Sequence, residues 1–201
     1  TWTPQLREQK TWRENGRKGM SDILETIESK NYVANIQFDT SPFNPREDDN
    51  LGTIIAFHSR YNYSDNNDWT KEELLEHIQK EDILSLPVYM YEHSGIALRT
   101  TPFNCKWDSG QIGYIFVSHA EIIECFGKLN LDQAGKNLIA EIDEFSEYCN
   151  GEVYGYQIYK KGEYRHDSDD VESCWGYIGY DHIKETVEEQ LKYWEKDKAN
   201  E

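Results

Sequence analysis

The chain has 201 residues, 13% of them aromatic, and carries 38 acidic against 21 basic side chains, a formal net charge of −17. The aromatic content favours a folded chain over a disordered one, because large rings supply the area that a hydrophobic core buries. No apolar run approaches the roughly 20 residues that cross a bilayer, and the N-terminus lacks the charged-then-apolar pattern of a signal peptide, so we expect a globular protein in a cytoplasm-like compartment.

The N-terminal residues differ in charge from the rest of the chain. Residues 1–20 hold five basic and two acidic side chains, a net charge of +3, so the other 181 residues carry −20. This shift predicts a basic N-terminal arm over residues 1–20, followed by a single acidic domain over residues 21–201. The arm also contains Trp2 and Trp12, which favour either a mobile segment or a short helix held by those rings.

The next segments alternate between helical and extended patterns. Apolar side chains recur at helical spacing after Ser21, which predicts a short amphipathic helix over residues 21–30. From Tyr32 to Phe38 every second residue is apolar, which is the period of a strand with that set facing inward. Residues 41–50 contain two prolines and indicate a loop, and the β-branched run 51–58 predicts a second strand.

The middle of the chain contains a helix signal and a hairpin signal. Thr70 followed by Glu73 forms a capping box, which predicts a helix that ends near Asp82. Two short β-prone runs flank a turn within residues 88–100, which predicts a hairpin. Pro87 cannot donate a hydrogen bond to a neighbouring strand. We therefore expect the first strand to begin at Pro87, and we expect no central strand directly before this residue.

A loop is expected over residues 101–113, followed by a strand over 114–117. Ser118 with Glu121 makes another capping box, and the helix that it opens should stop at Gly127.

The last third predicts a long helix over residues 132–149, a strand pair over 153–159 and 171–180, and a final helix from Asp181. Strands thus occur partly in hairpins and partly between helices. This pattern favours an α+β fold with a mixed, mainly antiparallel sheet, helices packed on one face and a C-terminal amphipathic helix.

Few of the common motifs of catalysis or cofactor binding are present. The four cysteines are widely spaced without a C-x-x-C pair, so we expect neither a zinc ribbon nor a dense disulfide framework. Free thiols are the simpler interpretation, and one or two disulfides are the alternative. Glycine-rich phosphate loops, H-E-x-x-H, G-x-S-x-G and a complete EF-hand are all missing. The acidic turns 65–68 and 167–170 offer oxygen ligands but lack the alternating calcium pattern. We therefore expect no metal and no cofactor.

Two polar turns flank one predicted strand and form the candidate ligand site. If that strand pairs with its neighbours, the turns converge and bring the following side chains together: Tyr91, His93, Ser94, Trp107 and Asp108. His93, Ser94 and Asp108 would then form an acid–base set, or the five would line a pocket for a small ligand. The alternative is ordinary turn chemistry, because Asp and Ser in turns often bond their own backbone.

Carboxylates gather in the last 61 residues, where 17 acidic side chains face seven basic ones. Carboxylates on a rigid face can imitate the phosphates of a duplex and occupy a basic groove. The candidate partner-binding residues are Glu185, Glu188, Glu189, Glu195, Asp167, Asp169 and Asp170. The alternative is a solvated helix face that needs no partner.

Several short motifs resemble a family of largely uncharacterised proteins encoded by bacteriophages and prophages. The resemblance spans roughly residues 45–180 and rests on Asn50-Leu51-Gly52-Thr53, Phe57-His58-Ser59-Arg60-Tyr61, Tyr91-Glu92-His93-Ser94-Gly95, Trp107-Asp108-Ser109-Gly110-Gln111-Ile112-Gly113 and Ser173-Cys174-Trp175-Gly176. It implies a viral protein in the cytoplasm of a host bacterium, and no catalytic residue.

Charge and resemblance together favour an acidic interaction protein. We expect it to inhibit a host defence protein, or another nucleic-acid-binding host protein, by occupying that protein's basic surface as a DNA mimic does. Its acidic body should not bind nucleic acid directly, nor a membrane. The alternative is a protein that binds or sequesters a small ligand or nucleotide near His93 and Trp107, with an enzyme at that site as a third interpretation.

Overall fold

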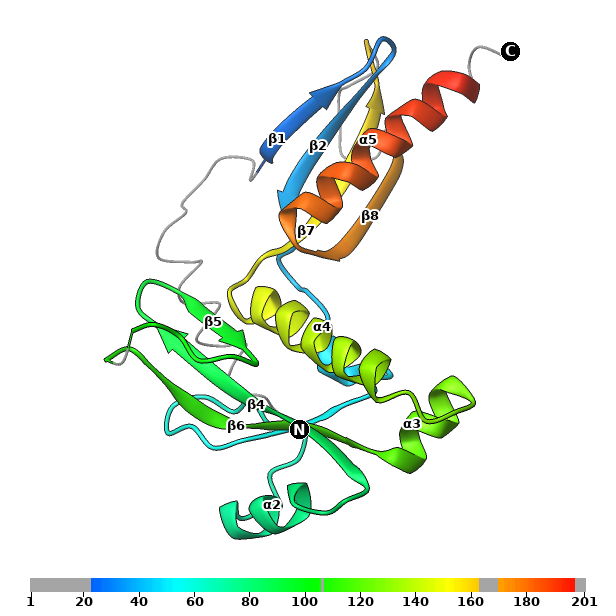
Figure 1. The fold of residues 1–201 in the computed structure, drawn as a ribbon. Coiled ribbons are helices and arrows are strands. Elements are labelled where there is room, and N and C mark those ends of the chain that lie inside the picture. The colour runs from blue at the N-terminus through cyan, green and yellow to red at the C-terminus, as the bar shows by residue number, and fades with distance from the viewer. Residues whose placement is uncertain (1–22, 106, 163–169, 198–201) are drawn as a thin grey trace. The chain divides into compact units, whose positions relative to one another are not determined.

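The computed structural model describes residues 23–105, 107–162 and 170–197, and these group into two compact units (Figure 1). The inserted unit is the continuous segment 44–150, and the split unit combines residues 23–43 with 151–197. Where the sequence predicts one domain over 21–201, the chain therefore forms two units, one inserted within the other. The arm over 1–20 lies outside the described residues.

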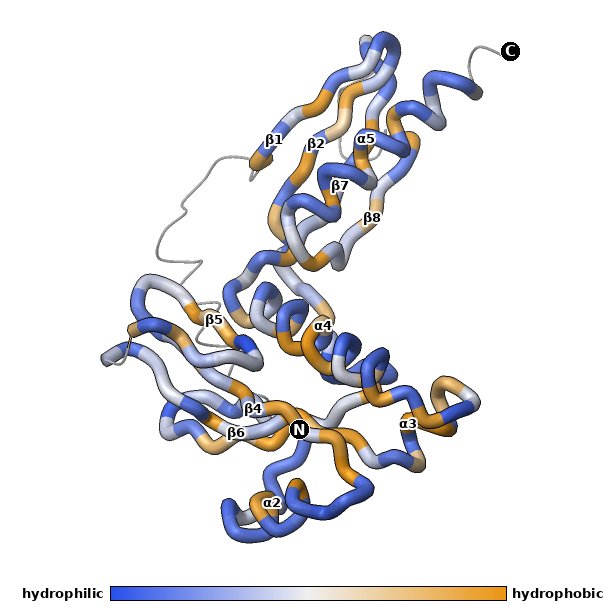
Figure 2. The backbone as a smooth tube through the Cα atoms, in the orientation of Figure 1, coloured by the Kyte–Doolittle hydropathy of each residue, from blue (hydrophilic) through white to orange (hydrophobic). Residues whose placement is uncertain are grey.

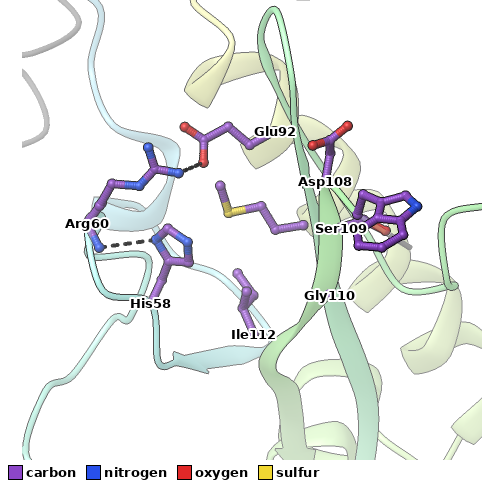
Figure 3. A pocket seen from close by; sticks show the side chains of 9 residues that line it. His58, Arg60, Glu92, Asp108, Ser109, Gly110 and Ile112 are labelled. Atoms are coloured by element: carbon purple, nitrogen blue, oxygen red, sulfur yellow. Dashed lines mark hydrogen bonds and ion pairs between the residues drawn. The ribbon is translucent and has the colours of Figure 1, made fainter. Parts of the chain in front are cut away.

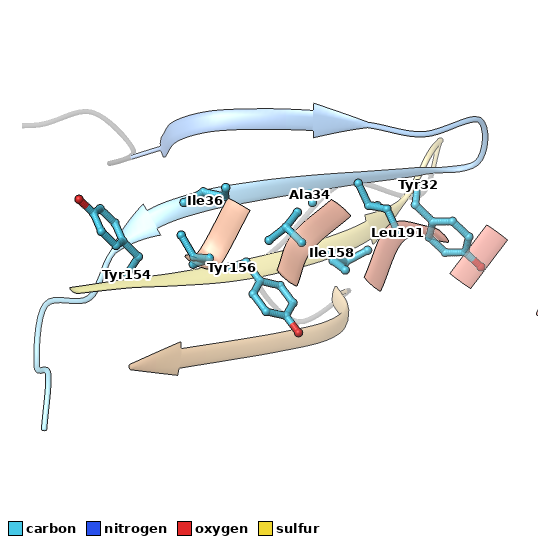
Figure 4. Packing of buried hydrophobic residues seen from close by; sticks show 9 residues of the cluster. Tyr32, Ala34, Ile36, Tyr154, Tyr156, Ile158 and Leu191 are labelled. Carbon is cyan, nitrogen blue, oxygen red and sulfur yellow. The ribbon is translucent and has the colours of Figure 1, made fainter. Parts of the chain in front are cut away.

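The split unit is one antiparallel sheet with one helix. Its strands are β1 (Ile23–Glu28), β2 (Tyr32–Phe38), β7 (Val153–Lys160) and β8 (Asp170–Ile178), in the order β1-β2-β7-β8. Helix α5 (Tyr180–Asp197) packs on one face, as Figure 4 shows for the side chains between them. The buried cluster consists of Tyr32, Ala34, Ile36, Tyr154, Tyr156, Ile158, Ile183, Val187 and Leu191. The inward alternation predicted for β2 is confirmed.

The predicted helix over 21–30 is wrong, because this segment forms the edge strand β1. Burial alternates along it, and the Glu25 carboxylate on the inner side accepts hydrogen bonds from the Tyr180 hydroxyl and from Lys184 Nζ at 2.9 Å. The inward position between Ile23 and Ile27 is thus acidic rather than apolar. This hides the two-residue period that identifies a strand.

The inserted unit contains the second sheet, in the order β3-β6-β4-β5, with every neighbouring pair antiparallel. Its strands are β3 (Thr53–Ala56), β4 (Ile83–Glu92), β5 (Ile96–Arg99) and β6 (Ser109–Ser118), and its helices are η1 (Pro45–Glu47), α2 (Lys71–Ile78), α3 (His119–Phe126) and α4 (Leu131–Cys149). Both predicted capping boxes are present, and Gly127 ends α3 with a φ of 71°. The α+β class is therefore confirmed.

Helices lie on both faces of this sheet (Figure 1). Helix α4 buries Leu138, Ile142 and Phe145, and Figure 2 shows hydrophobic residues alternating with hydrophilic ones along it. On the other face Leu74 of α2 packs with Ile55 and Phe116. The sequence predicts helices on one face of the sheet only. The apolar stripe of the short helix α2 is weaker than that of α4, so it does not reveal that α2 covers the other face.

The start of β4 and that of β6 differ from the sequence expectation. Strand β4 begins at Ile83 and runs through Pro87, although it is central in the sheet. Strand β5 pairs only with Tyr89–Glu92, so Pro87 sits where that side of β4 has no neighbouring strand and needs no donor. Strand β6 already begins at Ser109, inside the predicted loop 101–113.

The chain before and after β3 is anchored by a buried cation. The Arg46 side chain is 5% exposed and pairs with Asp65 at 2.7 Å and Glu141 at 2.9 Å. Asp65 also accepts the Ile54 amide hydrogen, so this member of the acidic turn 65–68 holds the backbone.

None of the described helices has the length and hydropathy of a membrane span.

Candidate functional site

A cavity of about 320 Å³ lies where β3 leaves the sheet of the inserted unit (Figure 3). Strand β3 ends at Ala56, and after Phe57 donates its amide to Ile112 O at 2.7 Å the chain turns away from β6. The space between this turn and the start of β6 is the β3–β6 cavity. Its lining residues are His58, Arg60, Met90, Glu92, Trp107, Asp108, Ser109, Gly110 and Ile112.

His58 presents a fixed hydrogen-bond donor to this cavity. Its Nδ1 accepts the backbone amides of Arg60 at 3.4 Å and Tyr61 at 3.3 Å, and its ring stacks on Tyr61 with 5.4 Å between centroids. A nitrogen that accepts an amide hydrogen does not carry one, so Nε2 is the ring nitrogen left to donate. Figure 3 shows Nε2 on the side of the ring away from the backbone amides, toward the cavity.

An ion pair spans the outer end of the cavity. Arg60 Nη2 donates to Glu92 Oε2, and the Tyr61 hydroxyl donates to Glu92 Oε1 at 3.1 Å. The Arg60 side chain is 64% exposed, which places the pair at the surface. Both carboxylate oxygens of Glu92 are therefore engaged, and its charge offsets that of Arg60.

Apolar side chains and a glycine form the floor. Met90 and Ile112 are 4% and 9% exposed, and Gly110 pairs with Met90 across β4 and β6. A Cβ atom built on Gly110 meets no atom within 4 Å, whereas one on Gly113 would lie 2.0 Å from Ile55 O. Gly113 is thus required by close packing, but Gly110 leaves room that any side chain would fill. A strand glycine of this second kind often marks the approach of a ligand.

The opposite wall carries an acidic group. Asp108 Oδ2 accepts from the Cys105 thiol at 3.6 Å and lies 3.6 Å from His93 Nδ1. The Asp108 side chain is 41% exposed, and no Lys or Arg of the described residues pairs with it. Ser109 directs its hydroxyl to Cys105 O. This wall therefore offers a carboxylate acceptor whose contacts with other side chains of the described residues are a thiol and an imidazole.

The structure divides the five predicted ligand residues into two groups. Trp107 and Asp108 line the cavity, whereas Tyr91, His93 and Ser94 do not. Successive strand residues point to opposite faces, so Tyr91 lies on the face opposite Met90 and Glu92, where its ring packs on Phe103 at 5.5 Å. His93 contacts the site only through Asp108, and Ser94 is exposed at the turn.

Sequence reasoning missed seven of the nine lining residues: His58, Arg60, Met90, Glu92, Ser109, Gly110 and Ile112. The available signal was a run of polar and aromatic residues directly after a β-branched strand, Phe57-His58-Ser59-Arg60-Tyr61.

The cysteine next to Asp108 does not have the geometry of nucleophilic catalysis. A thiol is activated by an imidazole that contacts it, with a carboxylate behind the imidazole. Here Cys105 and His93 both contact the same oxygen of Asp108, so the carboxylate stands between them.

Within the described ranges no three His, Cys, Asp or Glu side chains are placed to hold a metal ion.

The predicted partner-binding carboxylates also divide into groups. Glu185, Glu188 and Glu189 are exposed on α5, and none forms an ion pair with another described residue. Glu195 instead accepts from the Asn31 amide at 2.5 Å and the Ser29 hydroxyl at 2.7 Å, and these bonds lower its pKa below the ordinary value. Glu195 therefore holds the β1–β2 turn. Asp167 and Asp169, and the side chain of Asp170, lie outside the described residues.

Comparison of the chain with models of known protein families, with curated protein sequences and with solved structures gives no match. The resemblance to phage-encoded proteins therefore stays a prediction that rests on its motifs. Eight residues of those motifs line the β3–β6 cavity: His58, Arg60, Glu92, Trp107, Asp108, Ser109, Gly110 and Ile112.

Proposed function

We propose that this chain is a binding protein whose β3–β6 cavity holds a small ligand. The observation that carries the proposal is the cavity of about 320 Å³ itself, which combines a largely apolar floor with polar side chains and with open space beside the exposed Gly110. Around this space the polar groups are held from outside the cavity, His58 by backbone amides and Glu92 by Tyr61. Such preorganisation reduces the ordering that a ligand must otherwise bring about.

Binding fits this site better than catalysis. The Cys105 thiol and the His93 imidazole next to the cavity are separated by Asp108, and His58 in its lining has one nitrogen committed to the backbone. An enzyme at this place remains the less supported interpretation, because a nucleophile next to a general base is missing from the described lining. The proposed role is therefore to bind or sequester a small molecule.

A cavity-filling variant tests the proposal. Purified wild type is incubated with a metabolite extract of bacterial cells, separated by gel filtration, and denatured, and the released small molecules are identified by mass spectrometry. Gly110→Leu fills the space without a clash and should abolish retention. Gly135→Leu is the matched control, since its Cβ also meets no atom within 4 Å but lies on α4. Retention that is equal in all three proteins overturns the proposal.

A second candidate function is the binding of a basic partner, which the three exposed carboxylates of α5 favour. Glu185, Glu188 and Glu189 contribute to the net charge of −17 that the whole chain carries. An acidic surface of this kind attracts proteins with a nucleic-acid-binding face. Under this proposal the protein acts in a host bacterial cytoplasm as a DNA-mimic inhibitor of a defence protein.

Charge-matched variants test this second candidate. A triple Glu-to-Gln variant of α5 at 185, 188 and 189 should lose a partner captured from bacterial lysate, and high salt should release that partner from wild type. The control changes the exposed Glu72, Glu76 and Glu81 to Gln, the same loss of charge in the inserted unit. Equal capture by both triple variants contradicts a specific role for α5.

A further inference from the structure

We infer that the ligand of the β3–β6 cavity is a small molecule without net charge that carries a hydrogen-bond acceptor at one end and an amino group at the other. This inference rests on the proposed small-ligand function and narrows the ligand class. The acceptor faces His58 and Arg60, the amino group faces Asp108, and the part between them lies on Met90 and Ile112.

The charges of the described lining residues disfavour an anion. Arg60 is the only cation among them, and Glu92 offsets it at its Nη2. The Nδ1 atom of His58 is already engaged by two backbone amides, so this side chain offers a ligand a single donor at Nε2. Asp108 then leaves the lining with a surplus negative charge. A phosphate needs surplus cations or the amides of a helix N-terminus, and these lining residues lie on strands and turns.

The charge of the whole chain acts in the same direction. A net charge of −17 produces a field that lowers the local concentration of multiply charged anions and leaves neutral molecules unaffected. The phosphorylated nucleotides that the sequence suggested as ligands are thereby disfavoured. A nucleoside or a zwitterionic amino acid meets no such penalty.

The polar groups of the two walls are complementary to an acceptor and a donor. The turn after β3 supplies donors, the Nε2 hydrogen of His58 and the Nε and Nη1 hydrogens of Arg60, which have no partner among the described residues. The wall at the start of β6 supplies the Asp108 carboxylate as an acceptor. Between them the floor is apolar, and Gly110 lets a flat group approach the strand backbone.

The size of the cavity limits the ligand further. A volume of about 320 Å³ is at the lower end of small-molecule sites, which range from roughly 300 to 1,000 Å³. A nucleobase or one amino acid fits this space. Cytosine and guanine carry a carbonyl acceptor and an amino donor, adenine a ring-nitrogen acceptor and an amino donor, and an amino acid a carboxylate and an ammonium group on one carbon. These sources therefore share the acceptor and donor chemistry that the two walls require.

Matched compound pairs test the inference by equilibrium dialysis against the full chain. The probes are the four ribonucleosides with their 5′-monophosphates, and the twenty amino acids with their N-acetyl derivatives. We expect one nucleoside or amino acid to bind at least about tenfold more tightly than its charged or acetylated counterpart, a difference of about 1.4 kcal/mol. The arm that gives the hit identifies the source.

Variants connect that binding to the two walls. Gly110→Leu should abolish it, and Asp108→Asn should weaken it by about tenfold through loss of the charged acceptor. Glu81→Gln, which removes one exposed carboxylate elsewhere in the inserted unit, should leave it unchanged.

Two outcomes overturn the inference. In one, a monophosphate or N-acetyl compound binds more tightly than its partner; in the other, no compound of the panel binds wild type. If the extract experiment still yields an anionic ligand that Gly110→Leu excludes, the proposed small-ligand function is supported. The inference that the ligand has no net charge is then wrong. If the extract yields no ligand sensitive to Gly110→Leu, the proposed function itself is wrong.

Discussion

Arg46 joins segments of the inserted unit that are far apart in the sequence. Its guanidinium donates to Asp65, to Glu141 and to Gly52 O at 2.6 Å, while Glu141 also accepts the Leu51 amide at 2.8 Å. Burial acts to lower the pKa of Arg46, but the two carboxylates more than compensate and raise it. The cation is therefore permanent, and the turn that carries one wall of the cavity is anchored by it.

Replacing Arg46 should cost the inserted unit much of its stability. Arg46→Met leaves Asp65 and Glu141 without their counter-charge in a poorly hydrated site, and the expected loss is about 3–5 kcal/mol. Urea unfolding followed by circular dichroism measures it. Lys136→Met removes an exposed i, i+4 pair with Asp132 and should cost less than about 0.5 kcal/mol. Similar losses in both variants would contradict the anchoring role.

Gly155 shows the opposite use of a glycine from Gly110. A Cβ on Gly155 would lie 2.1 Å from Trp175 Cε3, because the indole lies directly against the backbone of β7. We expect Gly155→Ala to displace the ring and destabilise the split unit by about 1–3 kcal/mol. Gly110→Ala should be neutral or gain about 0.4–1 kcal/mol from the unfolded state. Tryptophan fluorescence with urea unfolding distinguishes the two, and equal effects refute the packing argument.

Among the elements, helices could be predicted from local sequence better than strands. The capping boxes at Thr70 and Ser118 and the stop at Gly127 depend on residues three to nine positions apart, and all are confirmed. Strand β1 could not be recognised, because its inward Glu25 is acceptable only through Tyr180 and Lys184, which lie about 155 residues away. Pro87 is likewise acceptable within β4 only because β5 is short and pairs with β4 from Tyr89 onward.

Helix α5 and the β1–β2 turn are linked by Glu195, and this link should respond to pH. The pKa of Glu195 is lowered from 4.5 by the amide of Asn31, with the Ser29 hydroxyl as the next cause. A carboxylate with a depressed folded pKa contributes its stability fully above the unfolded value and loses it as the pH falls through the folded value. The stabilisation is therefore present at neutral pH and absent in acid.

The Glu195→Gln variant tests this link. It should lower the urea midpoint of the split unit at pH 7, and the difference from wild type should shrink as the pH falls below 4.5. Glu185→Gln, on the exposed side of the same helix, should show no such pH-dependent difference. A constant difference for Glu195→Gln at all pH values would contradict the linkage.

For the molecule as a whole, the candidate site could be predicted only in part. Trp107 and Asp108 were found because they follow one another in a recognisable turn. His58, Met90 and Gly110 come from three separate segments, and they meet because β3 is only four residues long while β6 continues past its end. The spacing of residues in the sequence does not show where one strand extends beyond the end of its neighbour.

The insertion of one unit in the other predicts that each can fold alone. Residues 44–150 contain their own sheet, their helices and the complete Arg46 network, so this fragment should give a cooperative unfolding transition. The Asp39 amide bonds to Val153 O at 2.8 Å, so a short Gly-Ser linker in place of 44–150 should preserve the split unit. Circular dichroism and gel filtration check both proteins; an unfolded 44–150 fragment contradicts the division.

The pairing of β2 with β7 has a consequence for synthesis on the ribosome. The β1–β2 hairpin emerges first, but its partner strand begins at Val153, after the whole inserted unit has been made. A lone hairpin is marginally stable, so the apolar row with Ala34 and Ile36 stays exposed while the inserted unit folds. The split unit closes last, and the nascent chain must keep that row from aggregating until β7 and α5 arrive.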